Sequence, residues 1–377
     1  MYHHDQRDYK VAVDETAKKF KRELEDAIHQ SQRSALTVIE RVQNQLPEDR
    51  MVHTKAMTFS MQEENNVRQI LMGIKGRGKN AFQMPLHRHA LSQVADAAGV
   101  PDAYITKMLA KPYGPELILE NFNTIFDKED DQKRLVRAIN GQVRGVLSDT
   151  YRRMDSRPII EAFAGACQQA GLVPIEGVGG DLRFCVRAVL PLVFSPAGQE
   201  VIAFGCELSN SDFGCGALSL RVFILRIWCT NYARLEEEIR KVHLGKRLDD
   251  NLELSQATYD LDTKTMASAT KDVVLASLAP AKVNGQVALL EKAMTEKIDF
   301  KQSLDTLPKM GLLKKEVDAV REIYNNGGVE ELPPGNTLYR MSNAISWIAK
   351  SAETAERRLE LEQVAGELLL PKKRAAA

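Results

Sequence analysis

Apolar residues first recur at near-helical spacing over Asp14–Leu46, a stretch that contains neither proline nor glycine. Phe20, Leu24 and Ile28 begin the apolar stripe, and charged residues stand between them. This pattern predicts a long amphipathic helix, which Pro47 ends. Such a helix packs on its own domain or forms an oligomer contact, and the lack of a sustained heptad favours the first.

The pattern changes to short apolar runs between Gln142 and Tyr232, rich in Val, Ile, Phe and Leu. Runs of this kind, bounded by Gly, Pro, Asn or Asp, predict β-strands. One helix, Pro158–Ala170, interrupts them, because proline stands in its first turn and Gly171 follows its end. The predicted strands are Gln142–Ser148, Leu182–Leu190, Glu200–Ser209 and Ala217–Cys229.

Helical patterns dominate on both sides of this β-rich part. Before it, Asn65–Met72 is interpreted as a helix, and after Asn231 the chain is charge-rich and helical, ending in a helix over Thr337–Leu370. We therefore expect an α+β fold, with a central, mostly antiparallel β-sheet and one inserted helix, flanked by long N- and C-terminal helices. The expected units are an N-terminal amphipathic helix (1–50), a helical or mixed subdomain (51–140), a β-rich core (141–234) and a C-terminal helical region (235–377).

The composition is that of an ordinary globular protein. Among 377 residues, 51 Lys and Arg balance 51 Asp and Glu, so a nucleic-acid contact would need a local basic patch. The longest stretch without a charged residue, Ala162–Ile175, is shorter than the roughly 18 apolar residues of a membrane span. The N-terminus lacks the apolar segment of a secretion signal. We therefore expect no membrane association and a cytoplasmic location.

One glycine-rich segment resembles a phosphate-binding loop. Gly73–Asn80 matches the pattern G-x-x-x-x-G-K, but Asn80 stands where Ser or Thr would ligate magnesium. The preceding residues also have a helical rather than a strand pattern, so nucleotide binding is disfavoured. The loop stays a candidate for simple phosphate contact through its basic residues Lys75, Arg77 and Lys79.

No other pattern indicates catalysis or a metal. Five cysteines lie in apolar surroundings without C-x-x-C spacing, which favours reduced core thiols. His87 and His89 lack a third ligand at suitable spacing. Asp149 and Asp155 are expected to pair with Arg or cap helices, and polar residues such as Asn210 to form turns. We expect a non-enzymatic protein with neither metal nor cofactor.

Arginine replaces lysine completely in the middle of the chain. Residues 134–234 contain eleven Arg and no Lys, against eight Asp and Glu, which leaves a charge of +3. Arg presents a planar fork to phosphate and can stack on bases, so this bias is typical of a nucleic-acid groove. The alternative is that these arginines form salt bridges with the eight acids, and the sequence does not decide between the two.

Spacing adds detail to the nucleic-acid hypothesis. In the expected strand Leu182–Leu190, Arg183 and Arg187 share one face and the apolar residues the other. Tyr151 directly precedes two arginines, and an aromatic ring beside cations suits single-strand binding. With the basic loop, the candidate nucleic-acid contacts are Arg144, Tyr151, Arg152, Arg153, Arg183, Arg187, Arg221 and Arg226.

A set of short motifs carries a family resemblance. In order, the motifs are Gly99–Tyr104, Asn121–Asn123, Val143–Arg152, Leu208–Gly214 and Trp228–Asn231. They resemble the phage/plasmid-like proteins of the domain-of-unknown-function family numbered 932, over about Leu86–Ala355. Thr150 and Tyr232 depart from the family pattern. The resemblance implies a mobile-element protein encoded among DNA-metabolism genes, with no proven activity.

The strand and helix order of Gln142–Cys229 is also similar to that of the Rad-type single-strand annealing proteins. That similarity implies a curved β-sheet with an Arg-lined groove in an oligomeric ring, and it is an analogy of fold alone.

These observations predict a single-stranded DNA binding or annealing protein of a phage or plasmid. It would act in recombination or replication as a homo-oligomer, beside phage or host replication and recombination proteins. The alternative is a non-catalytic interaction or scaffold protein that binds a host or replication protein through its helices, which Leu36→Asp or Leu361→Asp would disturb. A weaker option is a phosphate-handling enzyme that needs Lys79 to hold a nucleotide.

Overall fold

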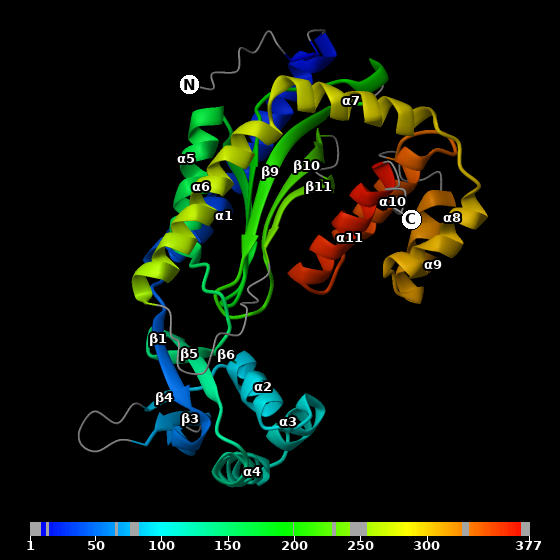
Figure 1. Cartoon of the computed structure of the whole chain (residues 1–377). Helices are drawn as coiled ribbons and strands as arrows, with labels where there is room; N and C mark the ends of the chain where they lie inside the picture. The colour runs from blue at the N-terminus through cyan, green and yellow to red at the C-terminus, as the bar shows by residue number, and fades with distance from the viewer. Residues whose placement is uncertain are drawn as a thin grey trace, which may run out of the picture.

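The computed structural model describes residues 9–12, 15–64, 67–75, 83–198, 200–227, 231–241, 255–325 and 332–370. The chain has the expected α+β fold, and it divides visually into three parts (Figure 1). A large β-sheet with its covering helices forms the sheet body, at the top of the view. Residues 48–148 form the lower unit beneath it, and residues 300–369 form the C-terminal bundle beside it.

The sheet body is built on five antiparallel strands in the order β11-β10-β9-β8-β7. Their bounds are β7 (Val173–Gly179), β8 (Phe184–Val189), β9 (Ile202–Asn210), β10 (Leu218–Arg226) and β11 (Asn231–Lys241). One face is covered by α5 (Ser156–Ala170), α6 (Gln256–Ser277) and α7 (Pro280–Thr295) (Figure 1). Alternate strand residues, such as Phe204, Cys206 and Leu208, enter that core.

The N-terminal helix runs along the edge of this sheet. Helix α1 (Glu15–Asn44) confirms the predicted helix, and it packs against β7. At Gly177 a Cβ atom would lie 2.4 Å from the carbonyl oxygen of Ser34, so only glycine allows this approach. The helix α5 is also confirmed, with Gly171 in the left-handed conformation (φ 70°) after its last residue. Strand β11 was not predicted, because the charge-rich sequence after Asn231 was interpreted as helical.

The lower unit contains more strand than predicted. Its strands are β1 (Glu48–His53), β2 (Met57–Glu64), β3 (Val67–Ile74), β4 (Gln83–Pro85), β5 (Lys133–Ile139) and β6 (Gln142–Ser148). Its helices are α2 (Arg88–Ala97), α3 (Asp102–Leu109) and α4 (Gly114–Lys128), with a short 3₁₀ turn, η2 (Thr54–Ala56). The strands form two three-stranded sheets, in the orders β1-β5-β6 and β2-β3-β4.

The helix predicted over Asn65–Met72 is therefore wrong, because most of that segment is strand β3. A short apolar run such as Ile70–Met72 has no period that separates a buried strand from a helix. The loop that resembles a phosphate-binding loop thus follows a strand, but β4 after it pairs antiparallel with β3. A hairpin, rather than the helix that such a loop requires, surrounds it.

The boundaries predicted between units do not separate distinct parts of the structure. The boundary at 50/51 lies inside β1, and the boundary at 234/235 lies inside β11. The boundary at 140/141 falls in the turn of the β5–β6 hairpin, where Asn140 and Gly141 both have positive φ. Strand β1 pairs with β5, so residues assigned to separate units share one sheet.

The C-terminal bundle covers part of the second face of the large sheet, beside Phe20, Leu24 and Ile28 of α1, which pack on the same face. It contains α8 (Phe300–Thr306), a 3₁₀ turn η5 (Leu307–Met310), α9 (Lys314–Asn325), α10 (Leu338–Ala349) and α11 (Ala355–Leu369). The single helix predicted over Thr337–Leu370 is two helices, because Thr354 caps a new helix by accepting from the Arg357 backbone N–H. Helix α11 lies directly on β11, where a Cβ on Gly366 would meet the Arg234 carbonyl oxygen at 1.8 Å.

Within the described part of the chain, no helix by itself has the length and apolar character of a membrane span. Helices α6 and α7 reach that length and composition only when taken together, and they are bent by 59° at their junction.

Candidate functional site

Arg187, predicted to face a nucleic-acid groove, lies instead at the centre of a buried ion cluster. It is 0% exposed and donates to Glu207 at 2.8 Å, to Glu176 at 2.6 Å and to Glu362 of α11. Its guanidinium also lies over the Tyr232 ring, 4.1 Å from the ring centre. A phosphate could reach Arg187 only by displacing α11, so we remove it from the candidate contacts.

The carboxylate partner Glu207 shows how strongly this cluster is coupled. Burial raises the pKa of a carboxyl group, but Arg234 and Arg187 outweigh burial and lower the pKa of Glu207 to about 2. Glu207 accepts hydrogen bonds from both arginines. These residues therefore bind α11 to the sheet through charge pairing rather than presenting charge to solvent.

Three further predicted arginines are held by acids. Arg226 makes two hydrogen bonds of 2.7 Å to Glu200, and both residues are buried. Arg152 pairs with Asp262 of α6. Arg153 pairs with Asp49 at 3.3 Å and covers the Tyr259 ring at 4.4 Å. All three are therefore in salt bridges, but only Arg226 pairs with one of the eight acids of its own segment, since Asp262 and Asp49 lie outside residues 134–234.

The Tyr151 ring is not available for stacking on a base. It is buried with Leu135 and Leu147, and its hydroxyl donates to the Ser211 carbonyl oxygen at 3.3 Å. Burial raises the pKa of this phenol well above its usual value. The aromatic residue beside two arginines in the sequence therefore has a packing role.

Arg183 differs from the arginines above. Among the described residues it has no carboxylate partner, and a terminal nitrogen lies 3.5 Å from Ser209 Oγ. Its Nε atom is buried without a hydrogen-bond partner, a feature it shares with Arg134, Arg144, Arg153 and Arg234. A Cβ on Gly216 would lie 3.3 Å from Arg183 Nε and 3.4 Å from Cζ, so Gly216 lets the guanidinium lie against the backbone. Within the described chain no carboxylate therefore pairs with this guanidinium, which lies just before the first residue of β8.

Arg144 of β6 is the second weakly matched cation near Arg183, and it is largely buried, with 8% of its surface exposed. It donates to the Asp181 carbonyl oxygen at 3.1 Å, while the Asp181 carboxylate is 4.0 Å away and largely exposed. Its Nε atom is also buried without a partner. Burial and the charge of Arg144 together lower the pKa of His87. Asp181 thus joins Arg144 to the strand end that carries Arg183, and we call these two arginines the Arg144/Arg183 site.

The remaining predicted contacts lie elsewhere or are engaged. Arg221 is buried and donates to Ser219 Oγ at 3.2 Å. Lys75 directly follows β3 in the lower unit and donates to the Lys55 carbonyl oxygen at 2.9 Å. Arg77 and Lys79 lie outside the described residues. No described contact joins Lys75 to the Arg144/Arg183 site.

A second ion cluster joins the lower unit to the sheet body, and sequence reasoning missed it. Arg137 of β5 is 1% exposed and contacts Asp49 at 2.7 Å and Asp155 at 2.5 Å. It also donates to the Asp212 carbonyl oxygen at 3.1 Å. The expectation that Asp155 pairs with an arginine is confirmed. The signal in the sequence was an Arg inside an apolar strand, which needs a partner when buried.

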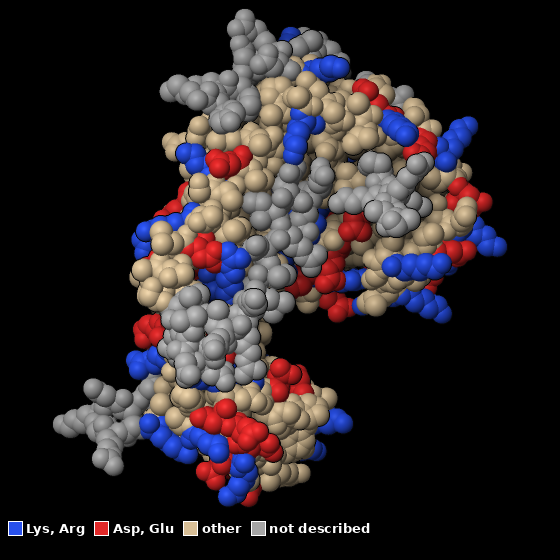
Figure 2. Space-filling model, viewed as in Figure 1, with Lys and Arg blue, Asp and Glu red and all other residues tan. Residues whose placement is uncertain are grey.

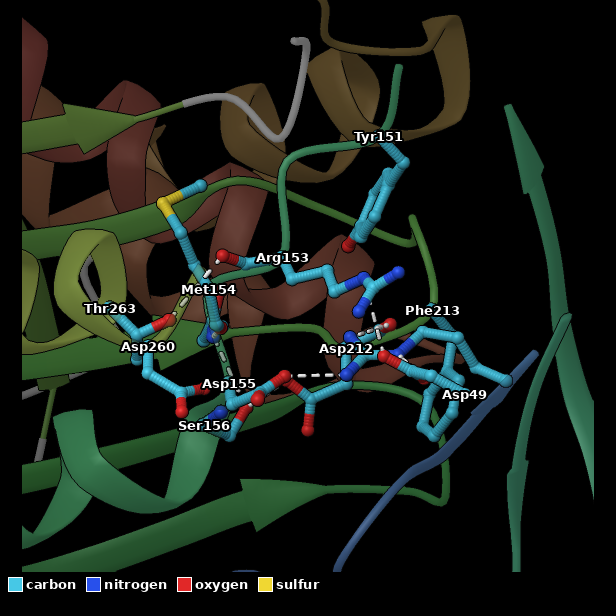
Figure 3. Close-up of polar contacts among 12 residues, drawn as sticks. Asp49, Tyr151, Arg153, Met154, Asp155, Ser156, Asp212, Phe213, Asp260 and Thr263 are labelled. Atoms are coloured by element: carbon cyan, nitrogen blue, oxygen red, sulfur yellow. Dashed lines mark hydrogen bonds and ion pairs between the residues drawn. The ribbon is translucent and has the colours of Figure 1, made fainter. Parts of the chain in front are cut away.

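Among the acids of this ion cluster, Asp212 is the one whose negative charge is least balanced by its neighbours. Figure 3 shows Asp155 and Ser156 close beside it, in the segment that follows Tyr151. Its carboxylate accepts from the backbone N–H of Ser156 at 3.0 Å and from Ser156 Oγ at 2.9 Å. Burial, together with the negative charge of Asp155, raises the pKa of Asp212 to about 6 despite these contacts and Arg137.

The turn after β9 brings a thiol beside an imidazole. Cys215 Sγ is 3.1 Å from His89 Nε2, and that nitrogen is also 2.9 Å from the Phe213 carbonyl oxygen. A carbonyl only accepts, so Nε2 carries the hydrogen and cannot take the thiol proton. Burial raises the pKa of Cys215 to about 11, so the sulfur stays a thiol. The pair lacks the features of an activated nucleophile.

The other described cysteines behave as predicted, but Asn210 does not. Cys167, Cys185 and Cys206 are buried free thiols, and Cys229 lies outside the described residues. The turn role predicted for Asn210 is wrong, because Asn210 is the last residue of strand β9 and its side chain donates to the Met154 carbonyl oxygen, 56 residues away, at 2.9 Å. In the part of the chain that the structure covers, no three His, Cys, Asp or Glu side chains are grouped to hold a metal ion.

Comparison with known proteins finds no family model, no curated protein and no solved structure that matches this chain. The resemblance to the phage/plasmid-like family and to the single-strand annealing fold therefore stays a prediction.

Proposed function

We propose that the protein binds single-stranded DNA without catalysing a reaction, and that the Arg144/Arg183 site is where it holds the phosphates. One observation carries this proposal: Arg183 has no carboxylate partner among the described residues, and the nearest carboxylate oxygen printed for Arg144 is that of the exposed Asp181, at 4.0 Å. An arginine whose charge is not matched by a close carboxylate favours a bound anion such as a phosphate.

The surroundings of the site suit an extended strand. Figure 2 shows the molecule hollowed between the C-terminal bundle and the lower unit. Arg144 belongs to the lower unit and Arg183 to the sheet body, so a ligand that touches both bridges the two parts. With the Tyr151 ring buried, the proposed contacts are to the backbone of the strand, and the bases stay free to pair with a complementary strand.

The family resemblance supports the biological setting of this proposal. In that setting the protein acts as a homo-oligomer in the cytoplasm of a bacterial host, where it anneals strands during phage or plasmid recombination or replication. Phage or host replication and recombination proteins would be its other partners.

Fluorescence anisotropy with a labelled single strand of about 40 nucleotides, and with its duplex, tests the proposal across a salt series. Arg183→Gln removes the charge and keeps a polar, though shorter, side chain. We expect it to weaken single-strand binding severalfold and to reduce the slope of log affinity against log salt by about 1. The matched control is Arg157→Gln, which removes an exposed charge from α5.

An equal loss in both variants would mean that diffuse charge, rather than the site, binds the strand. Absence of binding by the folded protein at low salt would overturn the proposal. If binding is retained and Arg183→Gln weakens it, an annealing assay with two complementary strands follows.

Of the two substitutions that were to test the interaction or scaffold alternative, only Leu36→Asp is suitable. Leu36 on α1 is 50% exposed, so Leu36→Asp changes a surface and leaves the core intact. Leu361 is 2% exposed, and an aspartate there would unfold the bundle instead of testing an interface. Loss of a protein partner with Leu36→Asp, together with unchanged DNA affinity, would favour this alternative.

A further inference from the structure

The C-terminal bundle contains a pocket that none of the functions above uses. Its volume is about 420 Å³, within the roughly 300–1,000 Å³ range of small-molecule sites. Helices α9, α10 and α11, which Figure 1 shows within the bundle, line it together with residues between the last two. Helices α9 and α11 contribute residues three or four positions apart, which share one helix face, as Ala319 and Ile323 do on α9, and α10 contributes Trp347 and Ile348.

The floor of the pocket is apolar. Ile348 and Leu361 belong to the buried core of the bundle, and Ala319, Ile323 and Ala352 are partly buried against that core. The small alanine side chains leave the space that the pocket occupies. An apolar ligand would therefore bury its surface on side chains that are already packed in place.

The charges at the rim neutralise one another. Arg357 contacts Glu316 at 2.5 and 2.8 Å, and Lys315 contacts Glu353 at 2.8 Å. The Arg357 hydrogen bonds lower the pKa of Glu316, so this carboxylate stays ionised and paired at neutral pH. Neither an anion nor a cation would find an unmatched partner there, which favours a neutral ligand.

Two polar side chains of the lining make no hydrogen bond to the described protein and are accessible to water, since Trp347 is half-buried and Ser351 is exposed. Trp347 and Ser351 stand four residues apart on one side of the α10 end, and both line the pocket. Within the described residues, neither the indole N–H nor the Ser351 hydroxyl has a hydrogen-bond partner. Both groups can donate, so they fit a ligand that carries a hydrogen-bond acceptor.

We propose that this pocket is a binding site for a small, neutral, largely apolar molecule with one acceptor group, such as a ketone or ester. The apolar floor contributes most of the affinity, and Trp347 and Ser351 orient the acceptor. The site is separate from the Arg144/Arg183 site, so its occupancy does not depend on the DNA proposal.

The test uses Trp347 as its own reporter. Trp228 is the only other tryptophan in the sequence, so Trp228→Phe leaves a single indole. The probes are cyclooctanone, cyclooctane, which lacks the acceptor, and octanoate, which carries a charge. We expect a saturable change of Trp347 emission that is strongest with the ketone, about threefold to tenfold in affinity over the hydrocarbon. Octanoate should be the weakest probe.

Two variants locate the binding. Ala319→Phe fills the pocket and should weaken the ketone by about tenfold or more, while the matched Ala103→Phe on the exposed face of α3 should not. Ser351→Ala should remove the preference for the ketone over the hydrocarbon. A linear, unsaturable response to all three probes would overturn the proposal. Equal saturable binding to Ala319→Phe with an unchanged melting temperature would also overturn it.

Discussion

Arg183 and Arg187 lie four residues apart at strand β8, but the fold gives carboxylate partners to only one of them. Arg187 is surrounded by three carboxylates under α11, whereas Arg183 lies against Gly216 with no acid beside it among the described residues. The side chains are identical, and their positions in the strand pattern are equivalent. The difference shows that the role of an arginine here depends on which carboxylates the fold brings to it.

The largest expected effect comes from breaking the Arg187 cluster. Arg187→Met removes the only cation that contacts Glu176, Glu207 and Glu362 together, and leaves buried carboxylates without a full set of partners. Removing one partner of a buried pair typically costs about 3–5 kcal/mol. We expect a loss of that size in the free energy of unfolding, measured by urea denaturation.

The control for this variant is Arg157→Met, which breaks the exposed pair with Glu161 on α5. Exposed pairs contribute about 0–1 kcal/mol. A loss below about 1 kcal/mol for Arg187→Met would contradict a structural role of the cluster.

We expect an intermediate effect on stability at the ion cluster around Arg137, because the negative charge of one of its acids, Asp212, is poorly balanced by its neighbours. The pKa of Asp212 is raised to about 6. The folded protein therefore holds this proton more tightly than the unfolded chain, whose Asp pKa is near 3.9. The resulting stabilisation is full below about pH 4 and is lost as pH rises through about 6.

Asp212→Asn cannot titrate and keeps an oxygen that accepts from Ser156. Between pH 4 and pH 7 we expect the variant to gain up to about 3 kcal/mol of stability relative to the parent protein. Chemical denaturation of both proteins at the two pH values measures this difference, and titrations common to both cancel. A difference that does not change with pH would contradict the raised pKa.

The smallest expected effect on stability is that of Arg183→Gln. The side chain has no ion pair to lose within the described chain, so we expect a change within about 0.5 kcal/mol. Thermal unfolding of the variant beside Arg187→Met gives the comparison directly. A loss as large as that of Arg187→Met would show that Arg183 is structural, and would remove the basis of the DNA-binding site.

The sequence predicted the strand around β8 but not what covers it. Alternation correctly separated Phe184 and Val186, which enter the helix-covered core, from the arginines. The second face was predicted to present its arginines to nucleic acid, because the residue that covers Arg187, Glu362, lies 175 residues further along the chain. A local pattern cannot identify a partner at that separation.

The candidate site was predictable to the same limited degree. The bias toward arginine drew attention to the segment of the chain that contains the buried ion pairs. Several of the eight acids in the same segment form those pairs, as Glu207 does with Arg187 and Glu200 with Arg226. What distinguishes Arg183 is its contact with Gly216, across a turn between two strands. The Cys215 and His89 contact spans 126 residues and left no local signal either.

The docking of α11 also sets an order for folding during synthesis. Residues of β8, β9 and β11 leave the ribosome well before Glu362, so Arg187 lacks this one of its three carboxylate partners until α11 has been made. Because Gly366 of α11 lies against β11, the second face of the large sheet is complete only after the last helix has been translated. In ribosome-bound chains that stop before residue 355, α1 should cover part of that face and leave the rest open, which is the stage most exposed to aggregation.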